Sequence, residues 1–193
     1  MRATTSGAFV KAAEGAGATG AAVPGKADRG GEPGGVGGAV RAAAGVGAAG
    51  MFAAGALHAA WPFTPWPLAS HAELAEVVVG VTEDRLPSVP LTLGVAGLLG
   101  AAGYLVLSGG RLAPAVGPEK LNRLGLWTVA GVLAARGAGG LVQSGLRMGE
   151  APDSYRFWDL ALYSPLCLTL AGLTAFVAHR TRTRARARAG TAA

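Results

Sequence analysis

Four long apolar segments divide the chain, and almost every charged residue lies outside them. They cover residues 42–60, 89–108, 124–146 and 160–178, each close to the roughly 20 residues that a helix needs to cross the hydrocarbon layer of a membrane. No water is available in that layer, so each segment must satisfy its backbone groups internally, as a helix does. The pattern therefore predicts an all-α fold, a bundle of four transmembrane helices.

The two ends of the chain differ from this middle region. Residues 1–38 are rich in glycine and alanine and bury too little apolar surface to offset the entropy of ordering them, so we expect a disordered tail. The transmembrane domain then occupies residues 39–179, and a basic tail occupies residues 180–193.

Composition agrees with a membrane location and charge predicts the orientation. In this chain 51% of the residues are hydrophobic and only 15% are charged. In a soluble domain roughly a quarter of all residues are charged. Basic residues gather in the 109–123 loop and after residue 179, while the other two loops are mainly acidic. Because basic loops stay in the cytoplasm, we expect a multi-pass protein of the cell membrane with both chain ends inside.

The formal net charge of +6 raises the question of nucleic-acid binding. Five of the arginines lie in one run, between residues 180 and 188, directly after the last apolar segment. A basic run in that place is typical of a topology signal that contacts lipid phosphates. We therefore expect the lipid bilayer, and no nucleic acid, as its partner.

The loop between the first two spans contains a predicted short helix. Ser70 and Glu73 form a capping box at its start, and Gly80 is suited to its end. We expect this helix to lie at the outer interface, and Glu76 is its carboxylate without a capping role. The spacing of His71, Glu73 and Glu76 fits no recognised metal-binding pattern, so we expect no metal and no cofactor.

Arg136 is the one charged residue within the third span. A charge there costs several kcal/mol or more unless it is paired or reaches water. Asp159 begins the fourth span on the same side, so we predict an ion pair between the two. Gly139, Gly140 and Gln143 share the face of Arg136 at helical spacing. The pair either orients two helices or forms part of a functional site, and both readings stay open.

Glycines recur every three residues in the second span. They are Gly94, Gly97, Gly100 and Gly103. Small residues let membrane helices approach closely, so we predict that these glycines pack against a neighbouring helix. In the fourth span, Pro165 removes a backbone donor, and we expect a kink beside it.

Aromatic residues concentrate near the outer ends of the spans. An interfacial aromatic belt explains most of them, although a belt would normally favour both sides of the membrane. Their unequal distribution also suits a pocket open to the outer leaflet. Its candidate substrate-binding residues are His58, Trp61, Trp158, Tyr163 and Gln143.

The fourth span carries the most specific string, Tyr163-Ser164-Pro165-Leu166-Cys167-Leu168, preceded by Phe157-Trp158-Asp159. Together with His58, Trp61 and Arg136, this string resembles a family of small actinobacterial membrane proteins of unknown function. The resemblance covers roughly residues 42–178 and implies four spans without implying an activity. In size and topology the chain is more loosely similar to the compact membrane terpene cyclases of bacterial indole-terpenoid pathways.

The cyclase likeness implies an enzyme that acts on a lipophilic, prenylated small molecule. A protonated carboxylic acid would start cyclisation of the prenyl chain, and aromatic faces would stabilise the resulting cation. Glu76 is the candidate acid, and Asp159 and Arg136 complete the set of candidate catalytic residues. Two alternatives stay open: a binding or transport module for an anionic or amphipathic molecule, which would need an oligomer for transport, and a non-catalytic accessory protein.

The predicted orientation can be checked with reporter fusions. Reporters placed after Arg188 or within residues 109–123 should read as cytoplasmic, because the basic loops stay inside. Reporters near Glu83 and Glu150 should read as external. The reversed pattern would contradict the orientation.

Overall fold

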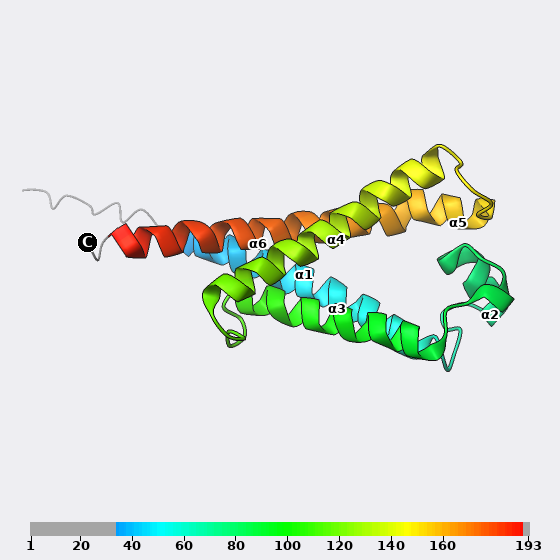
Figure 1. The fold of residues 1–193 in the computed structure, drawn as a ribbon, viewed down its shortest axis with the longest axis horizontal. Helices are drawn as coiled ribbons and strands as arrows, with labels where there is room; N and C mark the ends of the chain where they lie inside the picture. Colours follow the sequence, from blue (N-terminus) through cyan, green and yellow to red (C-terminus); the bar gives the residue numbers. More distant parts are fainter. Residues whose placement is uncertain (1–33, 191–193) are drawn as a thin grey trace, which may run out of the picture. The chain divides into compact units, whose positions relative to one another are not determined.

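The computed structural model describes the backbone of residues 34–190 and the side chains of residues 37–181. This part of the chain is helical and contains no strand (Figure 1). The long helices are α1 (Gly34–Ala60), α3 (Val89–Gly109), α4 (Glu119–Gly145) and α6 (Ser164–Gly190). The short elements are α2 (His71–Leu74), the π turn η1 (Ala75–Val79), the 3-10 turn η2 (Glu83–Arg85), α5 (Asp153–Trp158) and the π turn η3 (Asp159–Tyr163).

Four segments of this structure are long and apolar enough to cross a membrane. They are Gly37–Ala60, Val89–Gly109, Glu119–Gly145 and Asp153–Thr181. The prediction of an all-α fold with four segments able to span a membrane is therefore confirmed for the residues that the structure describes. The last span is longer than expected because α5, η3 and α6 follow one another without a break.

The first helix begins earlier than the sequence indicates. α1 starts at Gly34, so residues 34–38, which we expected in the tail, are helical. The remainder of that predicted tail, residues 1–33, lies outside the described residues. At the other end, the basic segment continues α6 as a helix to Gly190.

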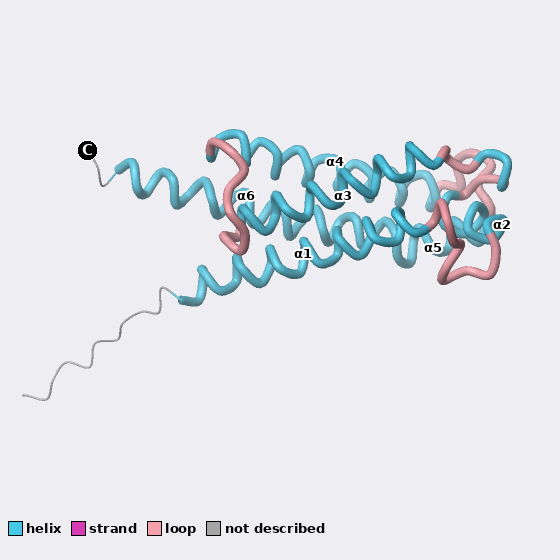
Figure 2. The backbone as a smooth tube through the Cα atoms, turned by 90° about the horizontal axis from the view of Figure 1, so that it is seen from below, coloured by secondary structure: helices cyan, strands magenta, loops and turns pink. Residues whose placement is uncertain are grey.

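The long helices form two pairs. α1 packs along α3, α4 packs along α6, and the pairs meet mainly through α1 and α6. We call the end that holds the start of α1 and the 110–118 connection the core end, and the opposite end, with α2, η1 and α5, the α2 end (Figure 2). The two pairs draw apart toward the α2 end (Figure 1).

The apolar core occupies the core end. Its buried members are mostly small or aliphatic, and they come from all four long helices: Val40, Ala44, Ala48, Met51, Ala102, Val106, Leu126, Leu170, Val177 and Ala178. Lipid tails are as apolar as these side chains, so close van der Waals packing rather than expulsion from water stabilises such a core. Small residues in α1 allow that packing.

Individual glycines mark the closest approaches between helices. A Cβ on Gly50 of α1 would lie 2.8 Å from Leu170 of α6. A Cβ on Gly137 of α4 would lie 2.7 Å from Leu168 and 2.9 Å from the backbone oxygen of Ser164, both in α6. The chain therefore needs glycine at these positions to bring α6 against its neighbours.

The glycines of α3 do not form the predicted packing face. A Cβ on Gly94, Gly97 or Gly100 would meet no atom within 4 Å, and only Gly103 faces a neighbour, the Phe52 ring. The reason is geometric: a step of three residues turns the helix by about 300°, so each glycine is displaced by about 60° from the one before. The prediction was correct for Gly103 and wrong for Gly94 and Gly97. Gly100 has no neighbour in the direction of a Cβ, but its amide nitrogen would lie 3.7 Å from a Cβ on Gly55 of α1.

The short helix in the first loop is confirmed. Ser70 Oγ accepts a hydrogen bond of 3.1 Å from the amide of Glu73, while Glu73 Oε2 accepts one of 2.9 Å from the amide of Ala69. The capping box thus closes one residue earlier than its usual form. α2 continues into η1 and ends at Gly80, whose φ of 80° lies in the left-handed region.

Ser164 alone separates Pro165 from the π turn η3. Proline lacks the amide that an α-helix requires, and the amide of Ser164 donates instead to the Asp159 carbonyl, five residues back. One extra residue is thereby accommodated within the helix. The distortion that we expected beside Pro165 is a π turn within a continuous helix.

The contact between α4 and α6 can be tested with a matched pair of alanine substitutions in one helix. Gly137→Ala should destabilise the protein by about 1–3 kcal/mol, because its Cβ meets backbone that cannot move away cheaply. Gly139→Ala is the control, since its Cβ meets nothing within 4 Å. Thermal unfolding in detergent measures both, and equal effects would contradict the close approach.

Candidate functional site

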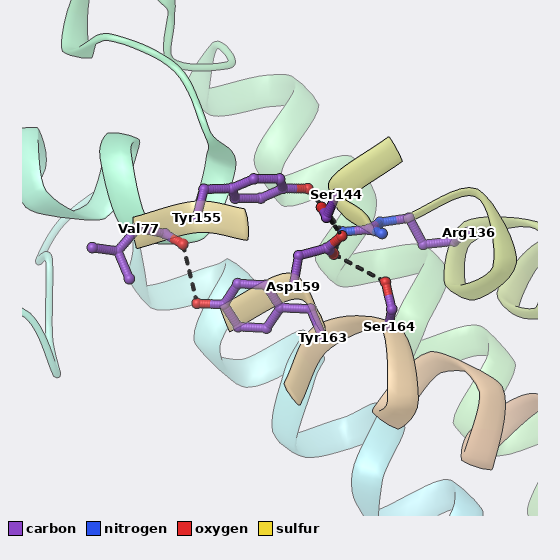
Figure 3. Close-up of polar contacts among 7 residues, drawn as sticks. All are labelled: Val77, Arg136, Ser144, Tyr155, Asp159, Tyr163 and Ser164. Carbon is purple, nitrogen blue, oxygen red and sulfur yellow. Dashed lines mark hydrogen bonds and ion pairs between the residues drawn. The ribbon is translucent and has the colours of Figure 1, made fainter. Parts of the chain in front are cut away.

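Asp159 is the centre of a polar cluster between α4 and the last span. Its side chain is fully buried, and η3 presents it to α4. It accepts hydrogen bonds from Arg136 Nη2 at 3.0 Å, from Ser144 Oγ at 2.6 Å and from Ser164 Oγ at 3.1 Å (Figure 3). The predicted ion pair is confirmed, and two hydroxyls that we did not predict complete the surroundings of the carboxylate.

Gly140 makes room for this cluster. A Cβ there would collide with Ser164 Oγ and Arg136 Nη1 and would lie 2.8 Å from Asp159 Oδ2. Arg136, Gly140 and Ser144 are spaced at intervals of four residues, so they share one side of α4. The arginine side chain crosses the bare backbone at Gly140 to reach the carboxylate.

Arg136 is bound at one end of its guanidinium only. Nη2 donates to Asp159 and, at 3.2 Å, to Tyr155 Oη. Nε and Nη1 make no hydrogen bond to any residue in the described part of the chain, and 42% of the side chain is exposed. A guanidinium has five N–H donors, and the three on Nε and Nη1 remain for an acceptor such as a carboxylate or phosphate oxygen.

The cluster is linked to the first loop. We call residues 71–80 the α2–η1 segment. Tyr163 Oη donates to the Val77 carbonyl at 3.3 Å, and Ser154 Oγ donates to Glu76 Oε1 at 2.8 Å. Segments about 80 residues apart in sequence therefore meet at the α2 end.

Arg156 holds the connection between α4 and α5 in place. It is 9% exposed, and its Nε and Nη2 donate to the carbonyls of Ala151 and Gly149 at 2.9 Å and 2.7 Å. This bracing fixes the start of α5, which carries Tyr155. Arg147 and Asp153, by contrast, form an exposed ion pair of 3.4 Å on the same connection.

The other predicted site residues lie apart from the polar cluster or on its margin. His58 Nδ1 pairs with the Ala54 carbonyl at 2.8 Å, and its ring lies 4.6 Å from that of Trp61. Trp158 is 43% exposed and contacts Phe157 edge to face. These residues form local contacts of their own.

Gln143 faces a separate hollow on the surface of α4. This shallow pocket has a volume of about 520 Å³, and its lining is mainly apolar: Ala138, Gly139, Val142, Gln143, Met148 and Gly149. Arg136 starts at the edge of the same helix face, but its long side chain turns toward Asp159. Gly139, Gly140 and Gln143 thus share the face of Arg136 along the continuous helix α4, as predicted, but only Gly140 lies against the guanidinium.

The polar cluster contains no metal site that the structure reveals. Among residues 37–181, no three His, Cys, Asp or Glu side chains lie close enough to hold a metal ion. Asp159 is occupied by three donors, and Glu76 is an isolated carboxylate beside Ser154. What the arrangement offers is a set of hydrogen-bond donors on Arg136.

These features define an integral membrane protein, a helical bundle with four candidate spans and a polar cluster buried at one end. The chain belongs to the family of proteins of unknown function called DUF3995, which it matches over residues 51–174, nearly two thirds of its length. The polar cluster lies within the matched residues, whereas the first part of α1 lies outside them. No curated protein and no solved structure matches the sequence. The resemblance to an uncharacterised family is thereby confirmed.

A double-mutant cycle measures the coupling between Arg136 and Asp159. Asp159→Leu alone should cost about 3 kcal/mol or more, because it leaves a guanidinium in a membrane span without its counter-ion. Replacing both residues with leucine should cost much less than the sum of the single changes. The readout is thermal unfolding in detergent.

The exposed pair of Arg147 and Asp153 provides the control cycle. Both side chains are more than 70% exposed, so their coupling should be no more than about 0.5 kcal/mol. Strictly additive losses at Arg136 and Asp159 would show that the two do not stabilise each other.

Proposed function

We propose that this protein binds an anionic amphipathic molecule within the membrane and that Arg136 holds its acidic head group. The observation that carries the proposal is the one-sided pairing of this arginine. Asp159 and Tyr155 both engage Nη2, while Nε and Nη1 donate to no described residue and the side chain is 42% exposed.

The energetic argument starts from the apolar surroundings. A guanidinium in a membrane span is costly, and its remaining donors need acceptors or water. Asp159 does not accept from Nε or Nη1: its Oδ1 accepts from Nη2 and Ser164, and its Oδ2 accepts from Ser144. An incoming carboxylate or phosphate would supply acceptors for the donors on Nε and Nη1 through charge-assisted hydrogen bonds.

The surface of the last span near Asp159 indicates that the remainder of the ligand is apolar. Exposed leucines lie beyond Asp159 along the last span, at Leu160, Leu162 and Leu166. An apolar chain attached to the acidic group would lie against such side chains at the lipid boundary. An amphipathic molecule therefore suits the site better than a small hydrophilic anion.

Proton-initiated cyclisation of a prenylated molecule is the alternative proposal. It requires a carboxylic acid that faces the substrate. The candidate acid, Glu76 of the α2–η1 segment, accepts a hydrogen bond from Ser154 of α5. Asp159 is buried and already has three donors. Binding at Arg136 requires neither carboxyl group to release a proton, so it makes fewer demands on this geometry. Product formation from prenylated substrates would favour the enzyme.

Equilibrium binding to the purified protein in phosphatidylcholine nanodiscs tests the proposal. Hexadecyl phosphate should bind, whereas hexadecanol and hexadecyltrimethylammonium should bind far less. Arg136→Lys keeps the charge beside Asp159 and removes the donors on Nε and Nη1, so it should weaken binding by about 10- to 100-fold. Thermal unfolding verifies that each variant is folded.

Arg147→Gln is the matched control, because Arg147 also pairs with an aspartate but is exposed. It should leave the affinity unchanged. Equal binding of the phosphate and the alcohol, or undiminished binding by Arg136→Lys, would refute the proposed function.

A further inference from the structure

We infer that the α2–η1 segment regulates the Arg136 site through Tyr155, a positioning residue that the docked segment holds against the guanidinium. The consequence for ligand affinity rests on the proposed function, whereas the positioning of Arg136 does not. Three separate contacts join the segment to the last span, and one of them reaches Arg136 through a single side chain.

That contact is between Gly80 and the Tyr155 ring. A Cβ on Gly80 would lie 2.8 Å from Tyr155 Cγ and about as close to both Cδ atoms, at 3.0 Å. The bare backbone of Gly80 thus lies flat against the ring. The opposite end of the same side chain accepts the hydrogen bond from Arg136 Nη2 at 3.2 Å. Tyr155 therefore connects the loop backbone to the guanidinium.

The other two contacts dock the segment beside this connection. Ser154 donates to Glu76, and Tyr163 donates to the Val77 carbonyl. The rings of Tyr155 and Tyr163 lie 6.4 Å apart, so both tyrosines face the same segment. Each contact comes from α5 or η3, and Asp159 is the first residue of η3.

The α2–η1 segment can undock from the last span and dock again with a small change in free energy. Its helix α2 has four residues, η1 has five, and only Leu74 and Ala75 are buried. Elements with few buried apolar contacts open with low free energy. The docked segment fixes Tyr155, and Tyr155 together with Asp159 fixes Nη2 and with it the position of the guanidinium. Undocking releases the ring and loosens Arg136.

Gly80→Ala tests this coupling, because its Cβ must displace the Tyr155 ring. Its φ of 80° also makes alanine strained, so a control with equal strain is needed. Gly117→Ala provides it: Gly117 has a φ of 77°, and its nearest neighbour would be Leu121 Cδ2 at 3.9 Å. Tyr155→Phe removes the hydroxyl and keeps the ring, and Ser154→Ala removes one docking bond.

The first readout is the rate at which phenylglyoxal modifies Arg136 in phosphatidylcholine nanodiscs, measured by mass spectrometry. Gly80→Ala and Tyr155→Phe should each raise this rate several-fold, Ser154→Ala should raise it less, and Gly117→Ala should leave it unchanged. Adding Gly80→Ala to Tyr155→Phe should have little further effect, because both act through one hydrogen bond. An unchanged rate in Gly80→Ala, or an equal rise in Gly117→Ala, would overturn the inference.

The second readout is the affinity for hexadecyl phosphate, which should fall about tenfold in Gly80→Ala and Tyr155→Phe. If hexadecyl phosphate fails to bind the wild-type protein while the modification rates show the expected order, the positioning role is supported and the proposed function is refuted. If it binds equally well to all variants, regulation by the segment is refuted and the binding function is supported.

Discussion

A guanidinium inside an apolar layer needs an acceptor, and in this chain the acceptor is Asp159. Much of the α2 end is arranged around that requirement. Gly140 leaves space for the arginine to cross α4, and the π turn before Pro165 aims the carboxylate at it. Ser144 donates to the second carboxylate oxygen, Oδ2, and Ser164 donates to Oδ1 beside Nη2. Removing either charge would leave the other without a counter-ion in an apolar layer. The two charges therefore specify the pairing of α4 with the last span.

The bundle is held together in two different ways along its length. At the core end, aliphatic side chains and bare backbone pack closely, and α1 joins both helix pairs. At the α2 end the pairs draw apart, and directional polar contacts replace that packing. These polar contacts are fewer than the apolar contacts of the core end, and each can break without the others. The tightly packed half therefore serves as the scaffold, and the polar half is where a ligand or a conformational change can be accommodated.

Strong local constraints made part of this structure predictable from the sequence. Four apolar segments, each long enough to span a membrane, predicted a helical bundle. A single arginine within one of them, Arg136, predicted a carboxylate close to it. Ser144 and Ser164 were missed because their roles depend on the register between two helices and on a π turn, which adds a residue that ordinary helical spacing ignores. The α3 glycines were misread because regular spacing along the chain was equated with one face. Tyr155 was recognisable, since it precedes Asp159 by one helical turn.

The π turn η3 separates two helical phases within a single span. Residues before it and residues after it are offset by one position from the register of an uninterrupted α-helix, and each part can present its own side chains to its own neighbours. The turn holds one residue more than a regular α-helical turn, so Asp159 and Ser164, five residues apart, come onto one side of the span and their side chains meet at 3.1 Å. In an uninterrupted α-helix, five residues turn the chain by about 500°, which would place these two side chains about 140° apart. The extra residue is therefore what allows a serine of the last span to contact the aspartate that precedes it.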